Sequence, residues 1–89
     1  MNCSISEISD ITGGQLIGNS DATIRYILTD SRSLMYPAST LFFAIRGERN
    51  DGHDYIVELY CRGVRCFVAE KLPDKRHFLP DAAFVLVSK

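Results

Sequence analysis

The chain has 89 residues, 46% of them hydrophobic and 24% charged, which fits one small globular domain and excludes a disordered segment. Ten basic and 11 acidic residues give a formal net charge of −1 without a basic stripe, so no nucleic-acid partner is expected. No apolar run is long enough to span a bilayer, and the first residues lack the regions of a secretory signal. We therefore expect a cytoplasmic protein with no membrane partner.

The cysteines and histidines form no recognisable metal pattern. Cys3, Cys61 and Cys66 are odd in number and show no CxxC spacing, and the two histidines are distant from each other. Free thiols in a reducing compartment are the favoured interpretation, and no metal site is expected.

The first predicted element is a helix over residues 4–11. Ser4 can cap its start, and Glu7 three residues later completes a capping box. Isoleucines recur every three residues and form one apolar stripe, and Gly13 is placed to end the helix in the left-handed conformation.

Two short strands are predicted next, over residues 15–17 and 23–28. The segment 18–21, Gly-Asn-Ser-Asp, has the composition of a turn, and residues 23–28 alternate in the manner of a strand. The short linker favours a β-hairpin between the two strands.

The remaining elements predict a parallel βαβ core. Residues 41–45 form an apolar strand expected to be covered on both faces, residues 55–62 a helix capped by Asp51 and ended by Gly63, and residues 65–69 a second strand. Residues 71–81 contain two prolines and are expected to be a surface loop, and residues 83–87 form a last buried strand. The predicted fold class is α/β, a small mixed sheet with a parallel βαβ core and an amino-terminal helix plus β-hairpin.

Two polar segments flank the strand 41–45. Residues 29–32, Thr-Asp-Ser-Arg, precede it, and residues 46–53, Arg-Gly-Glu-Arg-Asn-Asp-Gly-His, leave its carboxyl end, where open α/β sheets bind ligands. Hydroxyls, guanidinium groups and glycine-exposed amides in the two segments suit a polar anionic small molecule. The alternatives are a local Asx-type turn for the first segment and a solvated connection with a helix cap for the second.

The cluster of Asp51, His53 and Asp54 resembles an acid–base or metal set, which would make the chain a small hydrolase. Neighbouring residues on one loop rarely converge on one point, so capping by the aspartates and hydrogen bonding by His53 are favoured. The chain has neither GxxxxGK[ST] nor GxGxxG and thus no recognisable ATP or dinucleotide site of its own.

The motif order xTDSR, a short proline-containing segment, LFFAIRGE, NDGHDYI and CFVAE resembles the amino-terminal domain of the Mur ligases. These cytoplasmic enzymes build the peptide stem of bacterial cell-wall precursors. The resemblance implies an amino-terminal fold of the MurE and MurF type. It is strongest from Thr29 to Glu70, although Ser39-Thr40 stand where the family commonly has Gly-Asp.

The resemblance implies that this domain holds the UDP-N-acetylmuramoyl end of the substrate. The family contacts correspond here to Thr29 and Ser31 and to the three residues after Gly47, and Arg32 is an additional phosphate contact. The implied substrate-binding residues are thus Thr29, Ser31, Arg32, Glu48, Arg49 and Asn50. No catalytic residue is implied in this chain.

The opening ISEISDITGGQLIG resembles the members that add D-alanyl-D-alanine to UDP-N-acetylmuramoyl-tripeptide, including chains fused to an alanine racemase. Residues 1–89 are then one substrate-binding domain, expected to be a fragment of a multidomain chain. ATP and Mg²⁺ would be used by central and carboxyl-terminal domains beyond it, and pyridoxal phosphate by a fused racemase. The alternatives are the ligase that adds the third stem residue and a non-catalytic interaction module with the same fold.

Overall fold

A computed structural model describes residues 3–18, 22–29, 31–44, 55–72 and 81–87. Its elements, with η marking 3₁₀ turns, are β1 (Cys3–Ser4), α1 (Ile5–Thr12), β2 (Gln15–Ile17), β3 (Thr23–Ile24), β4 (Tyr26–Leu28), η1 (Ser31–Ser33), η2 (Pro37–Ser39), β5 (Thr40–Ala44), α2 (Ile56–Cys61), β6 (Cys66–Ala69) and β7 (Ala83–Leu86).

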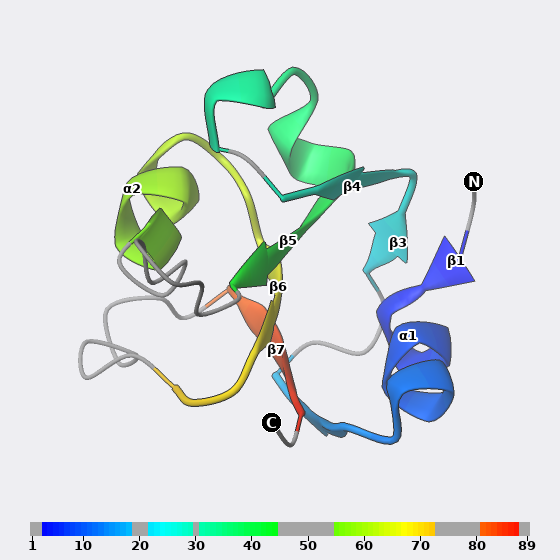
Figure 1. Cartoon of the computed structure of the whole chain (residues 1–89). Helices are drawn as coiled ribbons and strands as arrows, with labels where there is room; N and C mark the ends of the chain where they lie inside the picture. Colours follow the sequence, from blue (N-terminus) through cyan, green and yellow to red (C-terminus); the bar gives the residue numbers. More distant parts are fainter. Residues whose placement is uncertain (1–2, 19–21, 30, 45–54, 73–80, 88–89) are drawn as a thin grey trace.

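The main sheet has five strands in the order β2-β7-β6-β5-β4. The strands β4, β5, β6 and β7 are parallel neighbours, and β2 pairs with β7 in the antiparallel direction. Helix α2 joins two of the parallel strands, and α1 and α2 lie on opposite sides of the sheet (Figure 1). The predicted mixed sheet with a parallel βαβ core is confirmed.

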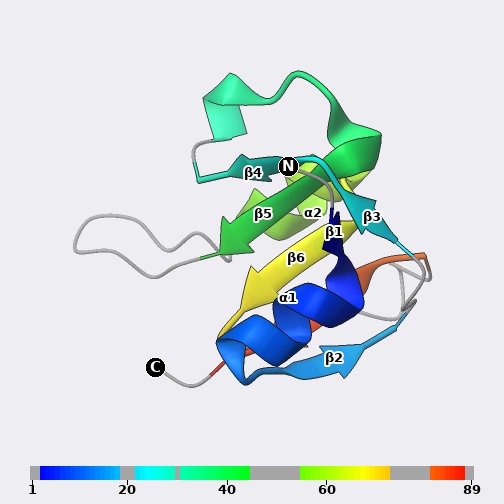
Figure 2. The same cartoon turned by 90° about the vertical axis from the view of Figure 1, so that its right-hand side faces the viewer.

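The predicted hairpin between residues 15–17 and 23–28 is wrong. Strands β2 and β4 lie at opposite edges of the sheet (Figure 2). The predicted second strand is also divided at Arg25, because β3 pairs with β1 in a separate two-stranded sheet while β4 pairs with β5. A turn-rich linker favours pairing between strands that are neighbours in the chain, but β2 instead pairs with the distant strand β7.

Gly14 shows how closely β2 is fitted to that partner. A Cβ atom at Gly14 would lie 2.6 Å from the backbone oxygen of Leu86 and 2.6 Å from Cγ1 of Val85. Only a residue without a side chain allows this approach, so the glycine favours the pairing with β7 that local turn composition does not reveal.

Helix α1 forms as its sequence predicts. The backbone N–H of Glu7 donates to the Ser4 hydroxyl at 3.2 Å, and the Ser4 N–H donates to the Glu7 carboxylate at 3.3 Å. Gly13 ends the helix with a φ of 71°. The capping box and the glycine stop are both confirmed.

Helix α2 is shorter than predicted and ends in a Schellman motif. It begins at Ile56, with Tyr55 at the capping position, and the predicted cap Asp51 lies outside the described residues. After the helix, the Gly63 N–H donates to the Tyr60 carbonyl and the Val64 N–H to the Leu59 carbonyl, both at 3.0 Å. Gly63 has a φ of 107°, which confirms its predicted role as the stop.

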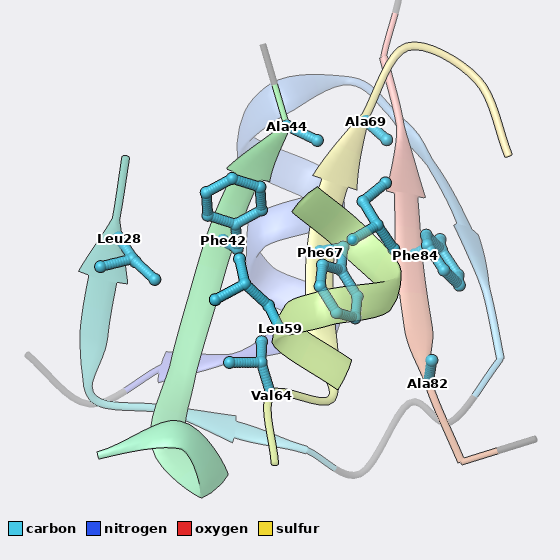
Figure 3. Packing of buried hydrophobic residues seen from close by; sticks show 10 residues of the cluster. Leu28, Phe42, Ala44, Leu59, Val64, Phe67, Ala69, Ala82 and Phe84 are labelled. Atoms are coloured by element: carbon cyan, nitrogen blue, oxygen red, sulfur yellow. The ribbon is translucent and has the colours of Figure 1, made fainter. Parts of the chain in front are cut away.

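Alternate side chains of the central strands enter two separate cores. On the α2 side, Phe42, Phe67 and Phe84 lie across three neighbouring strands beneath the helix (Figure 3). On the α1 side, the buried residues are Ile5, Ile8, Ile24, Leu41, Cys66, Val68, Ala83 and Val85. The sheet is therefore covered on both faces, as the apolar run at residues 41–45 predicted.

Candidate functional site

The candidate site lies at the edge of the sheet where β4 and β5 end. The two strands are parallel neighbours, with Leu28 opposite Phe42, so their carboxyl ends point in the same direction. Thr29 follows β4 and is exposed, and Ala44 is the last residue of β5. The two polar segments of the sequence thus begin at adjacent strand ends.

The first polar segment continues from Thr29 into η1, which contains Ser31 and Arg32. Thr29 and Arg32 both have exposed side chains, so each of these two predicted residues is accessible to a ligand. For Ser31 the structure describes the position in η1 and not the side chain.

The second polar segment lies outside the described residues. The predicted substrate-binding residues in it are Glu48, Arg49 and Asn50, and the alternative hydrolase set is Asp51, His53 and Asp54. Their contribution stays a prediction.

The connection from β4 to β5 is held by three contacts that sequence reasoning missed, since the sequence indicated only a proline-containing loop over residues 36–40. Leu34 packs against the core on the α2 side, and the Tyr36 ring stacks on Tyr26 with centroids 4.9 Å apart. The Thr40 hydroxyl donates to the Tyr36 carbonyl at 2.7 Å. Pro37 at the start of η2 was the available signal for a short 3₁₀ turn.

The cysteines are free thiols, as predicted. Cys61 is exposed on α2, and Cys66 is buried in β6, where desolvation raises the pKa of its thiol to about 11. A thiol with a raised pKa holds little thiolate near neutral pH, which argues for a packing role of Cys66.

The full sequence lacks a GxxxxGK[ST] loop. Within the described ranges, no three His, Cys, Asp or Glu side chains gather in a group that could hold a metal ion.

Neither helix in the described part of the chain is long and apolar enough to cross a membrane.

The fold defines a class of protein, an α/β domain with a mixed sheet in which the neighbouring parallel strands β4 and β5 end at the same edge. The sequence profile of the "Mur ligase family, catalytic domain" matches residues 23–85. Since the match covers most of the chain, this chain belongs to the Mur ligase family. The resemblance found in the motifs is thereby confirmed.

Relatives of two kinds match the chain. The UDP-N-acetylmuramoyl-L-alanyl-D-glutamate–2,6-diaminopimelate ligase of Phocaeicola vulgatus is 39% identical over 67 residues, which are 75% of this chain and 13% of that enzyme. The UDP-N-acetylmuramoyl-tripeptide–D-alanyl-D-alanine ligase of Escherichia coli is 38% identical over 55 residues, 62% of this chain and 12% of that enzyme.

The crystal structure of MurF from Acinetobacter baumannii has the same fold. It superposes with a TM-score of 0.78 at 24% identity, over 100% of this chain and 18% of that protein. The chain therefore spans less than a fifth of the length of each of these three proteins.

Proposed function

We propose that this chain binds the UDP-N-acetylmuramoyl end of a peptidoglycan precursor for an ATP-dependent Mur ligase of the cytoplasm. The observation that carries the proposal is the parallel pairing of β4 with β5, because it starts both polar segments at adjacent strand ends. A ligand bound there could contact both segments at once.

The residue types in the two segments suit a uridine diphosphate. The hydroxyls of Thr29 and Ser31 can donate to and accept from the uracil and the ribose, and the guanidinium of Arg32 suits the diphosphate. In the second segment, Glu48, Arg49 and Asn50 would add an acceptor, a second cation and an amide. The domain would hold the substrate near reacting groups supplied elsewhere.

We propose that the parent enzyme adds D-alanyl-D-alanine, because the opening residues of the chain resemble ligases that add this dipeptide. The ligase that adds the third stem residue stays an alternative, because the matched relatives include a 2,6-diaminopimelate ligase as well as a D-alanyl-D-alanine ligase. ATP and Mg²⁺ would be bound by ligase domains outside this chain, and an alanine racemase fused to the parent would bind pyridoxal phosphate. Sequencing the complete reading frame tests each of these expectations.

Calorimetric titration with UDP-N-acetylmuramic acid tests the binding proposal. The folded 89-residue chain should bind it saturably. Ser31→Ala should weaken binding about threefold to tenfold and Arg32→Ala about tenfold or more, since hydrogen bonds to charged groups contribute more than neutral ones.

Arg25→Ala is the matched control for Arg32→Ala. Arg25 is also an exposed arginine, but it precedes β4 and so lies at the opposite end of that strand. Its removal should leave the affinity unchanged. No saturable binding by a chain that circular dichroism shows to be folded would overturn the proposal and favour an interaction module.

A further inference from the structure

We propose that Thr40 is a positioning residue, whose hydroxyl fixes the connection that carries Ser31 and Arg32 to the ligand site. This inference rests on the proposed function of that site. Thr40 itself lies at the start of β5, opposite Tyr26, and therefore at the other end of β4 from Thr29.

The Thr40 side chain is the one buried polar side chain among the described residues, at 3% exposure. Its hydroxyl donates to the Tyr36 carbonyl at 2.7 Å. The same carbonyl accepts the Ser39 N–H at 3.1 Å, and the Ser39 carbonyl accepts the Arg25 N–H at 2.8 Å. These hydrogen bonds thus join the end of the connection to Arg25, the residue before β4.

Packing reinforces this attachment. The Tyr36 ring stacks on Tyr26, although both rings are exposed, and Leu34 enters the core on the α2 side. Leaving the buried Thr40 hydroxyl without its acceptor would lower the free energy of unfolding. The hydrogen bond to the Tyr36 carbonyl therefore stabilises the folded position of Tyr36.

The position of the connection matters because it runs beside an edge strand. Strand β4 lies at one edge of the main sheet, so among the described strands β5 alone pairs with it there. The described contacts that hold the connection include those of Leu34, Tyr36 and Thr40 and the backbone bond from Arg25 to Ser39, and Leu34 lies directly after η1. Releasing Tyr36 therefore removes one of these attachments and widens the range of positions that Ser31 and Arg32 sample.

The test compares Thr40→Val, which removes the hydroxyl and keeps the shape, with Thr40→Ser, which keeps the hydroxyl. Thr12→Val is the matched control, because the Thr12 hydroxyl donates to the carbonyl of Ile8 at 2.8 Å, again four residues earlier, in α1. Affinity for UDP-N-acetylmuramic acid is measured by calorimetry, and backbone hydrogen exchange of residues 31–39 is measured without ligand.

Thr40→Val should bind about threefold to tenfold more weakly and exchange the amides of residues 31–39 faster, which is the effect of one lost hydrogen bond. Thr40→Ser should restore both values, and Thr12→Val should change neither. Wild-type affinity and exchange in Thr40→Val would overturn the inference, as would equal weakening by Thr12→Val.

The two proposals fail in different ways. A folded wild-type chain that does not bind the nucleotide sugar removes the proposed function and with it the role of Thr40 in binding. If the wild-type chain binds and Thr40→Val binds equally well, only the inference about Thr40 is overturned.

Discussion

Gly13 and Gly63 each follow a helix with a positive φ, but their surroundings differ. A Cβ atom at Gly13 would meet no atom within 4 Å, whereas one at Gly63 would lie 3.1 Å from Cβ of Pro37. Gly13→Ala should therefore cost only the left-handed backbone penalty, about 1 to 2 kcal/mol. Gly63→Ala should cost more, because Pro37 in η2 must also move. Urea denaturation of both variants measures the difference, and equal losses would contradict the contact with Pro37.

The Cys66 thiol makes stability depend on pH above neutrality. Burial raises its pKa from 9.0 to about 11, so the folded state retains a proton that the unfolded state releases. The stability that the protonated, buried thiol contributes is complete below pH 9 and is lost as the pH rises through about 11.

Denaturation of the wild type and of Cys66→Ala between pH 8 and 11 measures this contribution. Their difference in free energy of unfolding should fall across that range by at most about 2 to 3 kcal/mol. Cys61 is exposed and present in both proteins, so its ionisation cancels. A difference that stays constant with pH would contradict the effect of burial.

At the scale of the element, adjacent residues of β5 pack into different cores, one on each face of the sheet. Phe42 is 2% exposed and packs edge-on against Phe67 on the α2 side, while Phe43 is partly buried on the α1 side. Phe42→Ala should cost about 3 to 5 kcal/mol, the usual loss for a fully buried phenylalanine. Phe43→Ala should cost clearly less, about 1 to 3 kcal/mol. Thermal denaturation compares the two, and the opposite order would contradict the assignment of faces.

The elements that sequence predicted well are those fixed by neighbouring residues. The start of α1 depends on Ser4 and Glu7, and the ends of both helices depend on a glycine, so short-range patterns were sufficient. The hairpin was wrong because strand pairing is decided by distant partners, and β2 found β7 instead of the next strand along the chain. The division of residues 23–28 at Arg25 has the same cause.

At the scale of the whole molecule, the strand pattern and the family motifs predicted where the candidate site lies and which residues form it, but not the contacts that hold them. The strand pattern placed the second polar segment at the carboxyl end of residues 41–45, and the structure adds that β4, which precedes the first segment, is the parallel neighbour of β5. The stacking of Tyr36 on Tyr26 could not be predicted, because it depends on the pairing of β4 with β5. The roles of the six substrate-binding residues stay predictions until binding is measured.

The antiparallel pair of β2 with β7 joins residues 15–17 to residues 84–86, almost the full length of the chain. During synthesis, β2 leaves the ribosome early and must remain unpaired until the last strand of the sheet emerges. Closure of such a distant contact carries a high entropic cost and slows folding. Nascent chains that stop before Ala83 would therefore leave an apolar strand edge available to chaperones and to other nascent chains.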